Sequence, residues 1–431
     1  MEVNISLKIP EEPTARWLFI GTRALVVGLL VILISTLSGR NDLDIYVAAS
    51  HSLWEGENIY LKKFIDGYSF FYSPLFAIAV SPFAFVPPLL AKLIWGIITL
   101  LLFKRCIDII FKDYLPKQLS ISQRTAILFF SLLFLFQAVR DNLNSSQVTV
   151  LLLWLCLESI RCINNRQVLL GVLLLALGID MKLIPMVLLP YLAYRGQWKA
   201  ALFTLALVTL IQLVPAIFIG WQYNADLLHT RWELLRPTDA RHILDEDETS
   251  FFALGSLLSA YLSADGGGPY TLDLPRTLIA LDLETIAKLL LVGRLVFIAC
   301  SLRFLKWPPF KQASSPLHVW WELSYLLLCT ILIFPHQRYY SMFMAMPAAL
   351  WLVQFAVVRW QEEQGRIRPW LALWVVVYLL SNIDLLLGEF AAVYEHYKVM
   401  SFMVIALIGM LWWCSPARLT KMLDDQRAEP I

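Results

Sequence analysis

Apolar stretches of roughly membrane-spanning length recur along this sequence, from Ala24 to Met410. A helix needs about 20 apolar residues to cross the hydrocarbon core of a bilayer. Lys and Arg residues in the short loops between the stretches orient them, because such residues are enriched on the cytoplasmic side. The expected spans are 18–37, 88–109, 125–139, 147–160, 168–179, 183–194, 200–220, 284–304, 317–333, 341–359, 370–388 and 398–414.

This pattern predicts an all-α, polytopic membrane protein with about 12 transmembrane helices and both termini in the cytoplasm. Its expected parts are an N-terminal seven-helix module over 1–220, a long external loop over 221–283 and a C-terminal five-helix module over 284–431. Segments 168–179 and 183–194 form either two short helices or one broken helix.

The first external loop, 38–87, contains an apolar stretch at 72–86 that several prolines interrupt. Counting this stretch as a further span would place the basic residues of 104–124 outside, against the positive-inside rule. We therefore expect helices that lie in the external membrane interface.

Composition agrees with a membrane protein, since 59% of the residues are hydrophobic and only 16% are charged. Soluble domains carry about 25% charged residues. The net charge of +2 gives no indication of nucleic-acid binding. The expected location is the cell (inner) membrane, no cofactor is predicted, and a requirement for a divalent metal stays open.

Polar residues gather on the predicted external side, in the segments 40–46, 140–147, 180–182 and 335–340. A charge at membrane depth costs about 2.5–3.5 kcal/mol on insertion scales, so such charges tend to pair or to line a polar site. The predicted external cavity has carboxylates that can act as a base and cations that can hold a phosphate. The candidate binding residues are Tyr46, Arg140, Asn144, Gln147, Lys182, His336, Arg338 and Tyr339.

Structural explanations exist for the same residues. Asp42 and Asp44 would also suit the point where a helix leaves the membrane at the level of the lipid headgroups. Lys182 could also extend its ammonium to the membrane interface. His336 would equally suit a hydrogen bond in an interfacial belt.

Two short motifs lie in the first external loop, the run Asp42-Leu43-Asp44-Ile45-Tyr46 and the stretch Tyr72-Ser73-Pro74-Leu75. They resemble the first-loop signature and the Tyr-x-Pro-Leu stretch of glycosyltransferase family 87. A Gly…Lys-x-x-Pro hairpin is matched by Gly178, Lys182 and Pro185, and a Gly-Gln-Val motif by Ser146-Gln147-Val148, with Ser in place of Gly. The resemblance extends over about 40–350.

The resemblance implies a GT-C-like membrane enzyme with its active site on the non-cytoplasmic face. Such an enzyme transfers a sugar, commonly mannose, from a polyprenyl-phosphate donor to a glycolipid or glycan acceptor. It also implies that a first-loop Asp is the catalytic base, and the motif alignment favours Asp42 over Asp44. Single displacement would invert the anomeric centre, and Lys182, Arg140 or Arg338 would hold the leaving phosphate.

Two other classes of function remain open. A lipid or glycan transporter or flippase would need polar residues through the membrane centre, where Glu322 and Asp384 are candidates. A non-catalytic scaffold subunit would have no need of the carboxylates in the first loop.

Overall fold

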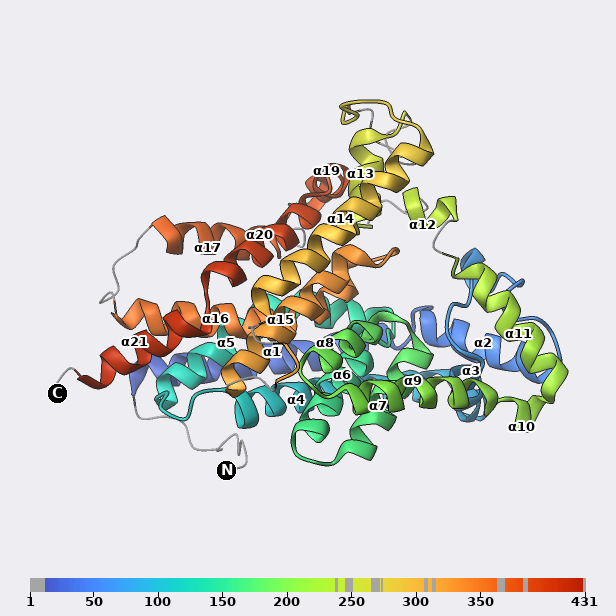
Figure 1. The fold of residues 1–431 in the computed structure, drawn as a ribbon, viewed down its shortest axis with the longest axis horizontal. Helices are drawn as coiled ribbons and strands as arrows, with labels where there is room; N and C mark the ends of the chain where they lie inside the picture. Colours follow the sequence, from blue (N-terminus) through green and yellow to red (C-terminus); the bar gives the residue numbers. More distant parts are fainter. Residues whose placement is uncertain are drawn as a thin grey trace.

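The protein is helical throughout the part that the computed structural model describes, namely residues 12–236, 239–244, 251–264, 272, 274–305, 309–311, 315–362, 369–382 and 387–428. All regular elements within these ranges are helices (Figure 1). Two isolated β-bridges are the extended pairings found there. The all-α prediction is confirmed for the described residues.

Six helices among the described residues are long and apolar enough to cross a bilayer. They are α1 (Pro13–Thr36), α5 (Ile121–Asn144), α9 with α10 (Trp198–Ile219), α14 (Leu283–Phe304), α15 (Pro316–Ile333) and η5 with α16 (Tyr339–Glu362). A seventh candidate, bent by 71°, joins Gly388–His396 to α20 (Val399–Trp413). The protein is therefore a multi-pass membrane protein, and the predicted count of about 12 spans is not confirmed.

Fewer helices than predicted are candidate spans, because several of the predicted spans are short helices or helices that contain charged residues. The 14 residues of α7 (Val168–Met181) rise only about 21 Å at 1.5 Å per residue, against a hydrocarbon core of about 30 Å. The next predicted span divides into η4 (Ile184–Val187) and α8 (Leu188–Tyr194). The span predicted at 370–388 is represented by α17 (Pro369–Leu380) and lies partly outside the described residues.

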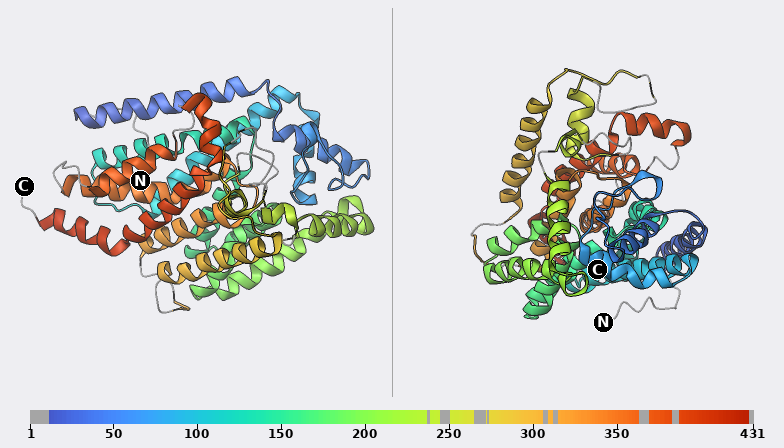
Figure 2. Two further views of the ribbon diagram at one scale, coloured as in Figure 1. Left: turned by 90° about the horizontal axis from the view of Figure 1, so that it is seen from above. Right: turned by 90° about the vertical axis from the view of Figure 1, so that its right-hand side faces the viewer.

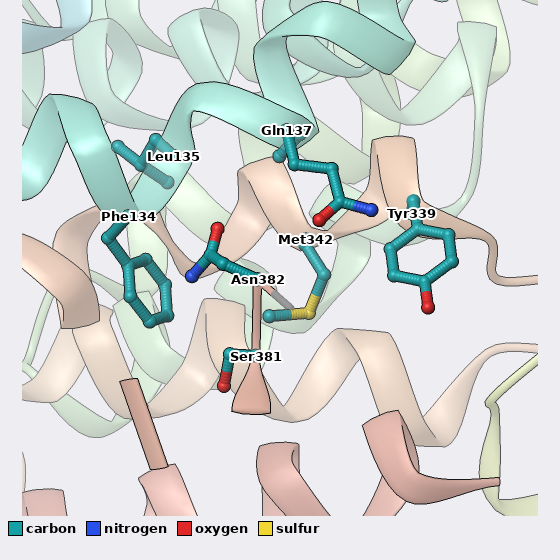
Figure 3. A pocket seen from close by; sticks show the side chains of 8 residues that line it. Phe134, Leu135, Gln137, Tyr339, Met342, Ser381 and Asn382 are labelled. Carbon is teal, nitrogen blue, oxygen red and sulfur yellow. The ribbon is translucent and has the colours of Figure 1, made fainter. Parts of the chain in front are cut away.

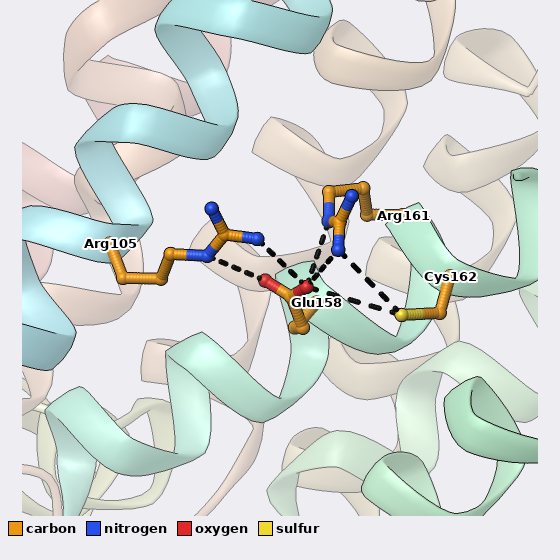
Figure 4. Close-up of polar contacts among 4 residues, drawn as sticks. All are labelled: Arg105, Glu158, Arg161 and Cys162. Atoms are coloured by element: carbon orange, nitrogen blue, oxygen red, sulfur yellow. Dashed lines mark hydrogen bonds and ion pairs between the residues drawn. The ribbon is translucent and has the colours of Figure 1, made fainter. Parts of the chain in front are cut away.

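The helices α4 (Pro88–Ile109) and α6 (Thr149–Asn164) lie close to the predicted limits, but both contain charged residues. Glu158 on α6 accepts hydrogen bonds from Arg105 on α4 at 3.0 Å and from its neighbour Arg161 at 2.8 Å (Figure 4). Two guanidinium groups thus neutralise one largely buried carboxylate, and this contact joins α4 to α6.

A second buried ion pair involves Glu322, the mid-helix acid of α15. Its carboxylate accepts hydrogen bonds from Arg195 at 3.0 Å and from the Tyr191 hydroxyl at 3.2 Å. Arg195 is 4% exposed and Glu322 is fully buried. Glu322 therefore links α15 to α8 and the residue after it. It does not supply the transmembrane polar pathway that the transporter hypothesis needs, and Asp384 lies outside the described residues.

The predicted polar loop at 140–146 is wrong, because α5 continues as a helix to Asn144. A capping box of Ser120 and Gln123 begins this helix four residues before the predicted start at 125. At its other end, the Asn142 side chain donates to the carbonyl of Ala138 at 2.7 Å and to that of Tyr340 at 2.9 Å. These two bonds satisfy the side-chain nitrogen of Asn142, which is fully buried although it lies in a polar turn.

The helices of the first predicted external loop and the first helix of the second lie together at one end of the molecule, on the right in Figure 1, whereas the later helices of the second loop lie against α14. The first loop forms α2 (Asp42–Trp54), η1 (Ile65–Gly67), α3 (Pro74–Val80) and η2 (Ser81–Phe85). The second forms α11 (Trp221–Leu234), α12 (Ala240–Leu244) and α13 (Leu254–Leu262). The hydroxyl of Tyr223 donates to the Glu57 carbonyl at 2.5 Å, and the Asn58 amide donates to Thr230 at 2.9 Å. These bonds hold α11 against the first loop.

The positions of α1 and of α21 (Pro416–Ala428) suit a topology with both termini on one side. In the left panel of Figure 2, α1 begins and α21 ends at the end of the molecule that lies opposite α2 and α3. The predicted cytoplasmic termini can be tested by attaching probes to single cysteines in a variant from which the six native cysteines are removed.

A cysteine introduced at Glu57 should react with an impermeant maleimide in intact cells. A cysteine at Lys117 should react only after the membrane is permeabilised. Both positions have exposed side chains, so burial does not limit the reaction. Labelling of both from the same side would show that the number of spans between them is misjudged.

Candidate active site

The amino-terminal turn of α2 carries the two first-loop aspartates. Asn41 caps this helix, since its side chain accepts from the Leu43 amide at 3.2 Å while the Asp44 carboxylate accepts from the Asn41 amide at 3.0 Å. Acidic residues in a first turn are stabilised by the positive end of the helix dipole. Residues two apart on a helix do not share a face, so Asp42 and Asp44 meet different surroundings.

The contacts of Asp44 give it a structural role. Its carboxylate forms an ion pair with Lys92 of α4 at 2.8 Å, and Lys92 is 8% exposed. The same ammonium donates to the carbonyl of Gly39 at 2.6 Å. Asp44 thus caps α2 and fixes the exit of α1 against α4.

Asp42 lies instead against the turn between α5 and α6. Its carboxylate accepts a hydrogen bond from the Gln147 side-chain amide, and its backbone amide donates to the Ser145 carbonyl at 3.1 Å. Gln147 is 4% exposed, and its Oε1 atom has no hydrogen-bond partner among the described residues. Two sequence segments about 100 residues apart therefore meet at Asp42.

The turn that carries Gln147 uses a left-handed residue. Ser146 has φ = 48°, a conformation that glycine adopts without steric cost. This is the position at which the resembled motif has Gly and this chain has Ser. The Ser146 amide donates to the Leu143 carbonyl at 3.3 Å and the Gln147 amide to that of Asn142 at 3.0 Å, so the backbone keeps the tight turn despite the side chain.

Buried tyrosines lie beside Asp42. The hydroxyls of Tyr46 and Tyr72 are 3.0 Å apart, and Tyr60 donates to the Tyr72 carbonyl at 2.7 Å. Burial raises the pKa of Tyr46, and burial followed by the nearby Asp42 carboxylate raises that of Tyr72. Both phenols therefore stay protonated and can serve as hydrogen-bond donors.

Lys182 follows the last residue of α7 and extends toward the same tyrosines. Its Nζ atom lies 6.0 Å from the ring centroid of Tyr72 and 5.8 Å from that of Tyr340, at the limit of cation–π contact. Burial lowers the pKa of Lys182 to about 8, while the Asp42 carboxylate acts in the opposite direction. The ammonium and the Asp42 carboxylate thus influence one another in a single site.

The late segment 335–340 closes this site from the other side. His336 adopts φ = 57° and its ring stacks on Phe71 of the first loop at 6.0 Å. Arg338 precedes η5 (Tyr339–Ala345), and its carbonyl accepts from the Ser341 amide at 2.8 Å. The Tyr340 carbonyl is the one that accepts from Asn142, so α5 holds this segment in place.

A small cavity of mostly apolar character lies next to Tyr339 (Figure 3). It is lined by residues of α5, of η5 and of the chain just after α17, including Gln137, Met342, Ser381 and Asn382. Of the candidate site residues, Tyr339 is among those that line this cavity.

Two predicted site residues are not part of the cluster around Asp42, Gln147 and Lys182. Arg140 and Asn144 lie on the last turns of α5 and are partly exposed. Within the described residues neither forms an ion pair or a side-chain hydrogen bond. Their proposed role in binding substrate stays a prediction.

Some contacts of the site had not been anticipated. The carboxylate of Asp180, in the last turn of α7, lies 3.9 Å from the guanidinium of Arg231 in α11. The same guanidinium donates a hydrogen bond to the backbone carbonyl of Asp180 at 2.6 Å. Lys92 is the partner of Asp44. A signal for Lys92 did exist in the sequence, because a lone lysine in an apolar run calls for a partner. Arg231 lies in a polar segment and gives no such signal.

Among the described residues, no three His, Cys, Asp or Glu side chains are grouped as metal ligands.

Comparison with known proteins gives one family. The model described as Glycosyltransferase family 87 matches residues 70–335, which is more than half of the chain. No curated protein matches the chain. The matched range contains Tyr72, Gln147 and Lys182, whereas Asp42 precedes it and His336 follows it directly.

Proposed function

The chain belongs to glycosyltransferase family 87, and from this premise we propose that it transfers a sugar from a polyprenyl-phosphate donor to a glycolipid or glycan acceptor. The family makes it a membrane glycosyltransferase. The lipid-linked donor, the choice of mannose and the inverting mechanism are parts of the proposal. So are the location in the cell (inner) membrane, with the site on the external face, and the modules 1–220, 221–283 and 284–431.

The observation that carries the proposal is the presence of a carboxylate and an ammonium in one tyrosine-lined site. Asp42 lies next to Tyr72, and Lys182 contacts the rings of Tyr72 and Tyr340. A carboxylate can take the proton of an acceptor hydroxyl, which contributes about 10²–10⁴-fold to a rate. An ammonium can hold the phosphate that leaves.

The reaction then follows as one displacement. The acceptor oxygen attacks the anomeric carbon while the bond from that carbon to the phosphate oxygen breaks. The hydroxyl proton passes to Asp42, and the electron pair of the broken bond leaves with the polyprenyl phosphate. Attack from the face opposite the leaving group inverts the anomeric centre. Lys182, with the neutral hydroxyls of Tyr46 and Tyr72 as further donors, would stabilise the departing phosphate.

The surroundings of the two aspartates support Asp42 as the base. The side-chain amide of Gln147 donates to the Asp42 carboxylate and orients it. Asp44 forms an ion pair with Lys92 and caps the helix, so its carboxylate has a structural role.

Donor specificity tests the proposed function. Membranes that contain the protein should transfer label from polyprenyl-phosphate-[¹⁴C]mannose to lipid or glycan and release polyprenyl phosphate in equal amount. Membranes without the protein provide the control, and polyprenyl-phosphate glucose tests the sugar. Labelling that depends on the protein but comes only from a nucleotide-activated sugar would contradict the lipid-linked donor.

The pKa of Lys182 predicts how donor use depends on pH. With a pKa of about 8, the lysine is cationic at pH 7 and largely neutral at pH 9. A phosphodiester donor stays anionic throughout this range, so kcat/KM for the donor should fall about tenfold between pH 7 and pH 9. In Lys182→Arg the guanidinium keeps its charge, and the fall should disappear. An equal fall in both proteins would assign the titration to another group.

A further inference from the structure

We propose that Arg231 of α11 is a positioning residue for the donor, because it fixes the chain at the end of α7 and thereby holds the ammonium of Lys182 beside Tyr72. The inference deepens the proposed function and rests on it for its kinetic consequence. The anchoring of α7 can be tested without an assay of transfer.

Arg231 lies on the inner face of α11, which packs against α3 of the first external loop. The buried residues of this helix are Asn224, Leu227 and Arg231, and their spacing of three and four places them on one side. Leu227 packs among the buried apolar residues of the first loop. The Asn224 amide donates to the Gln212 carbonyl at 3.0 Å. These contacts give Arg231, which is 6% exposed, a fixed position.

The part of the site that Arg231 contacts is the last turn of α7. Its guanidinium donates to the backbone carbonyl of Asp180 at 2.6 Å and lies 3.9 Å from the carboxylate of the same residue. The last carbonyls of a helix have no partner within the helix, and the helix dipole favours a cation at this end. Asp180 is buried, so Arg231 supplies to a buried carbonyl the hydrogen bond that the helix cannot.

Lys182 follows this anchored turn directly. Its backbone amide donates to the Gly178 carbonyl at 3.0 Å, and its own backbone is extended. One residue separates it from Asp180, so the direction in which the chain leaves α7 decides where its side chain lies. That side chain places Nζ 6.0 Å from the ring centroid of Tyr72.

Asp180 also joins the end of α7 to the first loop. The Ser73 hydroxyl forms a hydrogen bond with the Asp180 side chain, and Ser73 also caps the first turn of α3. Ser73 comes directly after Tyr72 in the sequence. Through Asp180, Arg231 thus holds both groups that meet at the proposed phosphate site, the lysine ammonium and the tyrosine ring.

A further contact fixes the far end of α11. The ring nitrogens of His242 on α12 lie 2.9 Å from the carbonyl oxygen of Leu234 and 2.9 Å from Nε2 of His336. Leu234 is the last residue of α11, three positions after Arg231. The helix that carries Arg231 is therefore tied to the segment 335–340 as well as to the first loop.

These contacts give Arg231 an indirect role. The guanidinium contacts Asp180, so its effect on the donor passes through the position of Lys182. Mutations whose effects pass through one shared residue are not additive. An arginine that bound the phosphate itself would instead act independently of Lys182.

Hydrogen exchange tests the anchoring without an assay of transfer. In purified, detergent-solubilised Arg231→Leu, the amide of Lys182 should exchange about tenfold faster than in the wild type, because the last turn of α7 loses a charged hydrogen bond. Mass spectrometry of peptides that cover 178–184 measures the rate. The matched control is Arg236→Leu, an exposed arginine paired with Glu233, which should leave this rate unchanged. Wild-type exchange at Lys182 in Arg231→Leu would overturn the proposal.

A double variant keeps the test valid if Arg231→Leu does not fold. Removing one partner of a buried ion pair leaves a lone buried charge, and Asp180→Asn combined with Arg231→Leu avoids this. The hydrogen bond to the backbone carbonyl is still lost, so Lys182 should again exchange about tenfold faster. An unchanged rate in this protein would equally overturn the proposal.

Kinetics give the functional consequence. Arg231→Leu should lower kcat/KM for polyprenyl-phosphate-mannose about three- to thirtyfold, within the range for loss of one charged hydrogen bond, and should leave acceptor KM unchanged. Arg231→Lys keeps the charge without the planar fork and should recover part of the loss. Added to Lys182→Met, Arg231→Leu should lower kcat/KM less than about twofold further.

Two results separate the inference from the proposed function. A further loss in the Lys182→Met background as large as in the wild-type background would overturn the positioning role, since Arg231 would then act on the donor independently. Absence of transfer by the wild type, together with faster exchange at Lys182 in Arg231→Leu, would refute the proposed function and leave the anchoring of α7 standing.

Discussion

Replacing Asp42 with Asn should lower kcat for sugar transfer about 10²- to 10⁴-fold, the contribution of a general base. The amide keeps the shape of the side chain and the first turn of α2, but it cannot accept the proton of the acceptor hydroxyl. Donor binding should change little, because the phosphate is assigned to Lys182. Single-turnover rates and the donor Kd of the purified protein measure the two effects separately.

Asp44→Asn is the matched control, two residues away in the same helix turn. It removes the charge that faces Lys92 and weakens the cap at Asn41. This variant should melt at a lower temperature while its kcat stays close to that of the wild type. Equal, mild losses of kcat in both variants would refute Asp42 as the base.

Replacing Lys182 with Met should weaken donor use about ten- to a hundredfold, which corresponds to the loss of one charged hydrogen bond of about 1.5–3 kcal/mol. Methionine keeps most of the apolar stem and removes the ammonium that faces Tyr72 and Tyr340. The loss should appear in kcat/KM for the donor at pH 7, with acceptor KM unchanged.

Two further variants make this result specific. Lys182→Arg should recover part of the activity, since it keeps the charge but has a planar head. Lys199→Met removes an exposed lysine beside Trp198 and should have no effect. Wild-type donor kinetics in Lys182→Met would show that this lysine does not hold the phosphate.

The sequence predicted best those helices whose ends carry local signals. The helix α4 begins at Pro88, directly after Pro87, and ends at Ile109 as expected. Proline at the first position of a helix is a strong local signal. The end of α5 was misjudged because Arg140 to Asn144 are polar, and the contact that buries Asn142 is a hydrogen bond to Tyr340, nearly 200 residues later.

In the candidate site too, local motifs were predictable from the sequence, and contacts between distant segments were not. Motif spacing indicated Asp42, Gln147 and Lys182, and the structure places Asp42 near the other two. The separate surroundings of Asp42 and Asp44 depend on Lys92 in another helix, which spacing along the chain cannot show. The helices α11 and α12 contain few apolar residues in a regular pattern, so their contacts through Arg231 and His242 were not predictable from hydropathy.

The central claim is that the site between α2, the end of α7 and the segment 335–340 holds the lipid-linked sugar for attack. The most direct measurement is a cryo-electron microscopy structure of the Asp42→Asn protein with polyprenyl-phosphate-mannose bound. We expect a phosphate oxygen about 3 Å from Nζ of Lys182, within hydrogen-bond distance, and the anomeric carbon with its open face toward residue 42. Donor density confined to another part of the molecule, with Lys182 and residue 42 both away from it, would contradict the account.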